Sequence, residues 1–229
     1  MLLIKLGTRT PYKGDGWGEK MVREDYAIIL DFLPNGYPFD PRPMFQKEPI
    51  AQAIGEQSFS LLELVPKKGV FLQPHERVYI GPERRDKIHH IASRIPYKKL
   101  TSTAKAELEF AIKEIIKNNE KRFVDFFNKA GPLTTRMHQL ELLPGLGKKR
   151  MWDIIEERRV KPFESFDDLK KRVKLMPDPD KLIMKRILEE LQEEQKHYLF
   201  VEPPRRREQG REGREYRDRT YSRVRFKKF

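Results

Sequence analysis

The chain of 229 residues contains no cysteine, which excludes a disulfide framework and any metal site built on thiolates. No apolar run approaches the roughly 18 residues that span a bilayer. No charged stretch followed by an apolar one marks a secretory leader. We therefore expect a cytoplasmic protein that has no membrane partner.

The sequence also lacks the motifs of the common enzyme classes. It contains no Walker loop, no GxSxG elbow and no HExxH helix. His89 and His90 are adjacent, so on a helix their side chains would diverge by about 100° and could not easily share a metal ion. Acidic residues are interleaved with Lys and Arg, and no carboxylate cluster suits a two-metal nuclease. These absences predict a protein that is not an enzyme and has neither cofactor nor metal.

Positive charge is what the chain has in excess. Its formal net charge is +13, and 36% of its residues are charged. Residues 203–229 hold eleven Lys and Arg against four Asp and Glu, a net +7. The rest of the chain is nearly balanced, so any binding surface there must come from local clustering of cations.

Both ends of the chain differ in composition from its body. Residues 1–21 are rich in glycine and have no sustained period, which predicts a flexible leader; translation starting at Met21 is a hypothesis. Residues 203–229 form an Arg-rich tail with few aliphatic side chains to bury, which predicts disorder. We expect this tail to bind nucleic acid through residues that include Arg205, Arg206 and Arg207. The alternative is a solubilising tail, or one that docks on an acidic protein.

The body of the chain predicts an α+β fold. Residues 22–100 are interpreted as a small OB-like β-barrel with a C-terminal helix, because short apolar strands alternate with turn signals; another kind of small β-barrel is the alternative. The apolar spacing of Ile88, Ile91, Ala92 and Ile95 predicts a helix over 82–95. The predicted strands are 26–33, 50–55, 58–65, 77–80 and a possible short strand over 70–72.

Aromatic and basic residues of the barrel are candidates for contacts with a nucleic-acid strand. Most aromatics of a small barrel belong to its core, so none is assigned a role on this ground alone. The candidates are Tyr26, Phe32, Phe59, Phe71 and Tyr79, with Lys67, Lys68 and Arg77.

The second half of the chain has helical periodicity. Residues 101–132 predict one long connecting helix that a Thr-Ser-Thr cluster can cap. Residues 133–202 predict a tandem helix-hairpin-helix domain. Its four expected helices cover 134–143, 148–159, 167–174 and 180–196.

The segment from Leu143 to Arg150, LPGLGKKR, carries the most specific signal for function. Gly145 and Gly147 allow a turn with φ > 0 and a close approach of the backbone to a partner. The helix that follows presents unpaired amides and the positive end of its dipole. The sequence therefore predicts a phosphate cradle formed by Gly145, Leu146, Gly147, Lys148, Lys149 and Arg150. The alternative is a tight turn that leads into a solvated basic helix.

A second turn follows the third helix of this domain, in the segment Met-Pro-Asp-Pro-Asp over 176–180. It has lost the glycines, it lacks N–H groups at its two prolines, and it carries negative charge. We interpret it as the structural partner of the first hairpin and not as a phosphate site.

Five segments are familiar when taken together: 50–55, 61–66, 77–81, 85–88 and the hairpin segment 143–149. With them the chain resembles the archaeal Domain of Unknown Function 655 family. The resemblance covers about residues 22–200 and leaves the leader and the tail outside. It implies an archaeal cytosolic source, a barrel joined to a helix-hairpin-helix region, and a role in RNA or nucleotide binding linked to RNA metabolism or translation. It brings no catalytic residues with it.

We expect a non-catalytic nucleic-acid-binding protein, with RNA favoured over DNA as the partner. Two other hypotheses remain open. One is a protein-interaction factor that docks on ribosomal or transcription proteins, and the other is an enzyme of DNA repair or processing.

Overall fold

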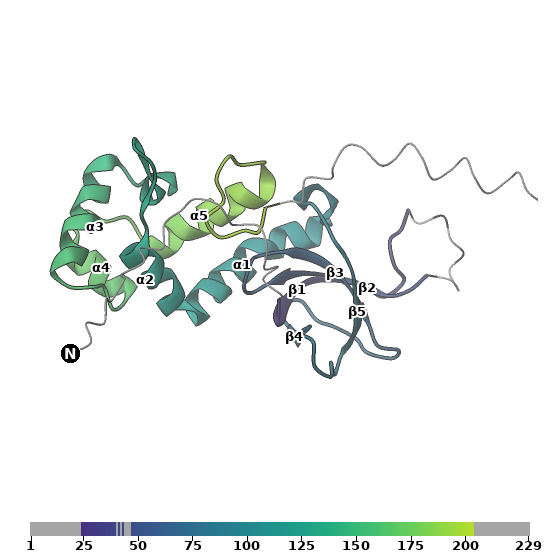
Figure 1. Ribbon diagram of the computed structural model, residues 1–229. Coiled ribbons are helices and arrows are strands. Elements are labelled where there is room, and N and C mark those ends of the chain that lie inside the picture. Colours follow the sequence, from purple (N-terminus) through teal and green to yellow (C-terminus); the bar gives the residue numbers. More distant parts are fainter. Residues whose placement is uncertain (1–23, 40, 42, 44–46, 204–229) are drawn as a thin grey trace, which may run out of the picture.

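The computed structural model describes residues 24–39, 41, 43 and 47–203. The fold is of the α+β class, with a curled antiparallel sheet at one end and helices at the other (Figure 1). Helix α1 (Ser102–Asn118) lies on the sheet, and α5 (Pro179–Gln192) packs beside α1 on the way to the far helices. No helix in the described part is long and apolar enough to cross a membrane.

Five antiparallel strands form the sheet in the order β4-β1-β2-β3-β5. Among the described residues, β4 and β5 pair neither with each other nor with a further strand, so the sheet curls without closing and has two free edges there. Val, Ile and Leu dominate the central strands, as expected for strands buried on both faces. The strands are β1 (Tyr26–Leu33), β2 (Ile50–Gly55), β3 (Leu61–Pro66), β4 (Arg77–Tyr79) and β5 (Ile88–Arg94).

Each face of the sheet buries its own set of side chains, because successive residues of a strand point to opposite faces. Ile29 and Leu64 belong to the cluster inside the curl, together with Leu72 and Val78 from its rim. Ile28 and Ile54 belong to the other cluster, which continues through α1 to the far helices. One face of the sheet therefore shares a continuous apolar core with the helices, and the other face has a separate core of its own.

The helix expected over 82–95 is wrong, because this segment contains strand β5. Two bulges, at His89 and Ala92, each add a residue opposite β3. A bulge interrupts the alternation of a strand, and the resulting spacing of three imitates one face of a helix. The short strand considered over 70–72 is absent from the described structure, and β3 begins at Leu61 instead of residue 58.

The connecting helix over 101–132 is also not a single helix. It consists of α1 and α2 (Glu120–Lys129), which are separated at Asn119, where φ is −121° and ψ is 32°. The Asn119 side chain donates to the Ile115 carbonyl at 3.0 Å and satisfies the end of α1. The Thr101 hydroxyl accepts from the Ala104 amide at 3.0 Å and caps the start of α1, as the sequence indicated.

The helix expected over 134–143 is wrong as well. The segment forms a small hairpin, β6 (Pro132–Thr134) and β7 (Met137–His138), followed by the 3-10 helix η3 (Gln139–Leu142). The His138 side chain accepts from the Leu140 amide at 3.2 Å, and Glu141 accepts from the His138 amide at 3.1 Å. This reciprocal capping box starts a new helix at Gln139 and so prevents one continuous helix. The remaining helices are α3 (Lys148–Val160), α4 (Phe166–Arg172) and α5, close to their expected positions.

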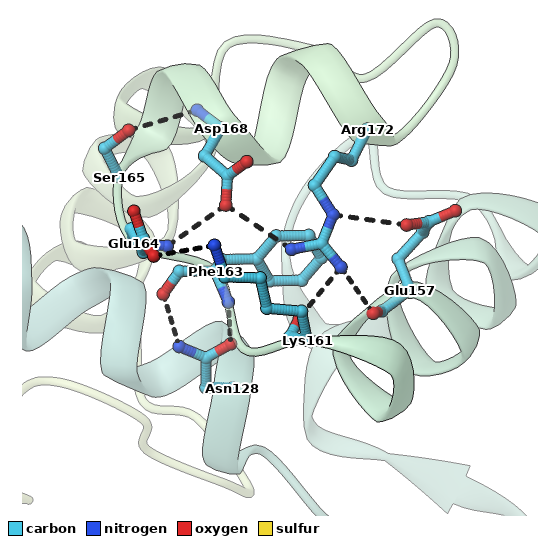
Figure 2. A network of polar contacts seen from close by, with 8 residues as sticks. All are labelled: Asn128, Glu157, Lys161, Phe163, Glu164, Ser165, Asp168 and Arg172. Carbon is cyan, nitrogen blue, oxygen red and sulfur yellow. Dashed lines mark hydrogen bonds and ion pairs between the residues drawn. The ribbon is translucent and has the colours of Figure 1, made fainter.

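Polar contacts fix the end of α3 against α2 and α4, as Figure 2 shows. Arg172 of α4 donates to the carbonyls of Glu157 and Lys161, at 2.5 and 2.8 Å, and stacks over the Phe163 ring at 4.5 Å. Asn128 of α2 exchanges two hydrogen bonds with the Phe163 backbone, at 2.9 and 2.8 Å. A cation at the last carbonyls of a helix also complements its dipole. The orientation of α3 is therefore set at its C-terminal end, away from the glycines.

Candidate nucleic-acid interface

The glycine turn, residues 143–147, joins η3 to α3. The Leu146 amide donates to the Leu143 carbonyl at 3.0 Å and closes the turn. Gly145 has φ +89°, a left-handed value that strains any residue with a Cβ. Gly147 is the N-cap of α3, with φ −71° and ψ 158°. The two glycines thus serve different purposes, since only Gly145 is required by the backbone conformation.

Gly147 borders open space, because a Cβ built on it would meet no atom within 4 Å. Among the described residues, no oxygen accepts from the amides of Gly147, Lys148, Lys149 or Arg150. These are the four amides that the start of a helix leaves without an internal partner. Since the turn is exposed around them, they can donate to an external anion.

Three of these four amides belong to consecutive cationic residues. Lys148 and Lys149 are exposed and Arg150 is half-buried. None of the three pairs with a carboxylate in the part of the chain that the structure describes. The positive end of the α3 dipole adds to their field. The arrangement can hold a singly or doubly charged oxyanion such as a phosphate group.

Leu146 does not offer its amide to an external anion, as the expected cradle would require. Its amide is already engaged with Leu143, and its side chain is 6% exposed. Leu146 therefore closes the turn and anchors it in the core. Of the expected cradle, Gly147, Lys148, Lys149 and Arg150 present their amides together, whereas Arg205, Arg206 and Arg207 lie outside the described residues.

A second turn, residues 173–178, repeats the backbone of the glycine turn between α4 and α5. The Met176 amide donates to the Val173 carbonyl at 3.3 Å, and Leu175 has φ +56°. This turn is one residue longer, with Asp178 as the N-cap of α5. Asp178, Pro179 and Asp180 stand where the first helix start has Gly147, Lys148 and Lys149.

The chemistry of the second turn opposes anion binding. Pro179 has no amide hydrogen, and Asp178 brings a carboxylate that pairs with Lys181 at 2.7 Å. The Leu175 side chain is 82% exposed and stands at the position that Gly145 occupies in the first turn. The two turns share one hydrogen bond and one residue with positive φ. Of the two, only the first has the amide donors and the positive charge that suit a phosphate.

The barrel aromatics do not form one surface. Phe59 is fully buried, so it cannot contact a ligand. The Tyr26 ring is covered by the Arg77 guanidinium at 3.4 Å, and Arg77 is itself paired with Glu56. Phe71 is 77% exposed at the loop before β4. The ring centroids of Tyr26 and Tyr79 are 5.3 Å apart, and those of Phe32 and Phe71 are 6.1 Å apart. The described barrel residues therefore supply two aromatic pairs, and no ring contact joins one pair to the other.

The histidines do not form a metal site in the described structure. The Nδ1 atoms of His89 and His90 are 2.8 Å apart on strand β5, instead of diverging on a helix. The Nε2 atom of His75 lies 2.6 Å from Glu107 Oε2. No group of three potential metal ligands occurs among the described residues.

Trp152 is the feature of this site that the sequence patterns missed. The sequence places it within the apolar segment that follows the glycines, yet its side chain is 55% exposed. Met151, Ile154 and Ile155 are the residues of α3 that enter the core. Their spacing of three and four defines the buried face, and this signal could have placed Trp152 outside it.

The comparisons with known proteins agree on one family. The family model described as "Protein of unknown function (DUF655)" matches residues 23–202. The chain belongs to this family. The DUF655 proteins that it resembles are archaeal. An uncharacterized protein of Methanocaldococcus jannaschii is 50% identical over 180 residues, which cover 78% of this chain and 80% of the relative.

A solved DUF655 structure is also similar. It is the crystal structure of Af1531 from Archaeoglobus fulgidus, with 52% sequence identity and a TM-score of 0.72. The match covers 78% of this chain and all of that one. The resemblance seen in the sequence is thus confirmed at the level of the family.

Proposed function

We propose that this chain is a non-catalytic nucleic-acid-binding protein that holds a backbone phosphate at the start of α3. The observation that carries the proposal is the set of four amides, from Gly147 to Arg150, that have no acceptor in the described structure. Lys148, Lys149 and Arg150 add charge at the same place. Contacts of this kind bind the sugar-phosphate chain and carry no sequence information.

The surrounding architecture supports this proposal. We interpret η3, the glycine turn and α3 as one helix-hairpin-helix, and α4, the second turn and α5 as another that packs beside it. The methyl Cδ2 of Leu182 in α5 lies 3.7 Å from the position of a Cβ on Gly145, so α5 supports the turn directly. The second hairpin holds the first one in place and makes no phosphate contact.

The order of the strands supports a small barrel-like interpretation of the sheet, since β4-β1-β2-β3-β5 is also the order of neighbours in an OB barrel. The direction of β5 differs from that fold, because β5 pairs antiparallel with β3 here and the two strands run parallel in an OB barrel. RNA is favoured as the partner because arginine-rich segments, such as residues 203–229, commonly become ordered on RNA.

The dependence of affinity on salt tests the proposal. The full chain with Lys148→Gln and Lys149→Gln is compared with a control that carries Lys171→Gln and Lys174→Gln beside the second turn. Both double variants remove the same charge from exposed positions. For a single strand, each lysine that no longer neutralises a phosphate reduces the slope of log affinity against log salt by about 0.7.

We expect the first double variant to bind a labelled RNA more weakly and with a slope lower by about 1.4, because two lysines no longer neutralise phosphates. The control keeps nearly the slope of the unchanged protein. Equal slopes for both double variants would mean that only net charge matters and that the glycine turn is not the site. Absence of binding at low salt would refute the proposal altogether.

A further inference from the structure

Trp152 lies on the exposed face of α3, beside the amides that are proposed to bind phosphate. It follows Lys149 by three residues and Lys148 by four, so these side chains are neighbours on one stripe of the helix. One helical turn, about 5.4 Å of rise, separates the indole from the start of the helix. A group bound at the amides therefore has the Trp152 ring within reach.

The ring of Trp152 has no partner in the described structure. No aromatic side chain packs against it, and no Lys or Arg covers it. By contrast, Tyr26 lies under Arg77, and Phe163 lies under Arg172. Leaving half of an indole in water forgoes hydrophobic stabilisation of about 25 cal/mol for each Å² that could be buried. A flat apolar face, open to solvent and next to unpaired cations, suits a ligand that is both flat and anionic.

We infer that Trp152 stacks on an unpaired base of the nucleic acid whose phosphate is held by residues 147–150. The inference rests on the proposed function and extends it, because it defines the class of ligand. Inside a duplex both faces of each base are covered by its neighbours, so a surface ring has no face on which to stack except at the two blunt ends. The ligand is therefore single-stranded at this point, either along its length or in a loop, bulge or end.

A nucleotide suits the start of α3 better than a protein segment does, because this surface offers both free amides and an exposed indole. An apolar segment that covered Trp152 would leave the four amides without an acceptor and would lie against Lys148 and Lys149. A nucleotide brings an oxyanion to the amides and a π-face to the indole. Stacking of this kind tolerates any base, which agrees with the sequence-independent grip at the backbone.

Tryptophan fluorescence gives a direct test, because Trp17 and Trp152 are the two tryptophans of the chain. The full-length variant Trp17→Phe reports on Trp152 alone. It is titrated with three labelled ligands: a short oligouridylate, an RNA duplex of the same length, and an abasic strand of the same length. Anisotropy of the label measures binding independently of the indole. We expect the emission of Trp152 to be quenched by the oligouridylate and to stay unchanged with the abasic strand and the duplex.

Substitutions test the same stacking through affinity. Trp152→Ala should weaken binding of the oligouridylate about five-fold or more, as expected for removal of one base stack, and leave the abasic strand unaffected. Trp152→Phe should restore part of the affinity, since its ring can still stack. Phe110→Ala is the matched control, because Phe110 is 65% exposed on α1, and it should change nothing.

The outcomes separate this inference from the function on which it rests. If RNA binds, and Lys148→Gln with Lys149→Gln weakens this binding while the emission of Trp152 does not change, the hairpin role holds and the stacking is refuted. Equal quenching by duplex and single strand also refutes the inference about the ligand. If none of the three ligands binds, both proposals fail. If the chain binds no RNA, and a protein partner quenches the emission of Trp152, the exposed face of α3 is a protein-binding surface instead.

Discussion

Arg186 and Glu190 form a buried ion pair on α5, with Nε and Oε1 2.8 Å apart and each residue about 5% exposed or less. The Glu190 carboxylate also accepts from the amides of Leu199, Phe200 and Val201, at 2.7 to 3.0 Å. One carboxylate thus holds the returning segment 199–201 against the helix. The three amide hydrogen bonds and the Arg186 guanidinium together offset the cost of burying the Glu190 carboxylate.

Replacing this carboxylate should destabilise the fold strongly. Glu190→Gln leaves the buried Arg186 with only the longer contact to the half-exposed Glu189, at 3.6 Å, and such a change costs about 3 kcal/mol. For a chain of this size that cost corresponds to a fall in Tm of roughly 6–12 °C. Glu189→Gln is the comparison, because it removes only the longer contact to Arg186, at 3.6 Å and half exposed, and should lower Tm much less. Thermal unfolding followed by circular dichroism measures both, and equal shifts would contradict a structural role for the pair.

Gly147→Asp should separate stability from binding. Since Gly147 has an ordinary φ and faces open space, the new side chain fits without strain. Aspartate is a better N-cap than glycine, so the variant should gain a few tenths of a kcal/mol. The same carboxylate would occupy the free amides and repel phosphate, so affinity for RNA should fall.

Gly145→Ala is the comparison within the same turn. A left-handed φ of +89° is unfavourable for alanine, so this variant should lose roughly 1–2 kcal/mol. Denaturant unfolding and anisotropy on both variants measure the two effects. A Gly147→Asp protein that binds as well as the unchanged chain would contradict the proposed cradle.

His138 should make the segment before the glycine turn sensitive to acid. Burial and then the charge of Arg158 lower the pKa of His138, so the folded protein favours the neutral ring that caps η3. Because its folded pKa lies below the ordinary value of about 6.5, the unfolded chain takes up the proton first as pH falls. The stability contributed by His138 is therefore present above pH 6.5 and lost below it.

His138→Asn is the control for this effect, since asparagine can accept the same amide bond and does not titrate between pH 5 and 8. The free energy of unfolding of the unchanged protein should decrease relative to that of the variant between about pH 7.5 and 5. Urea unfolding across this range measures the difference. A constant difference across the range would contradict the assignment.

Much of the framework could be predicted from local sequence signals. Strands 26–33 and 50–55 and the start of α3 at Lys148 follow from apolar runs, glycines and charge, and the structure confirms them. The errors arise where tertiary pairing overrides local spacing. The bulges of β5 depend on its register against β3, and a single sequence contains no information about that register.

The candidate site was predicted in its location but not in its detail. The glycines and lysines indicate a turn and a basic helix start. The spacing of the buried residues of α3 contains the outward direction of Trp152. The sequence cannot show that the Leu146 amide is already used, because this depends on the conformation of the turn in three dimensions.

The unclosed sheet has a consequence for the behaviour of the protein in concentrated solution. A free strand edge invites pairing with another chain when it is long, flat and apolar. Here one edge, β4, is three residues long, and the other, β5, is interrupted by two bulges and carries His89, His90 and Arg94 toward solvent. Neither edge offers a straight template, so the sheet resists edge-to-edge aggregation without the protection that a complete barrel would give.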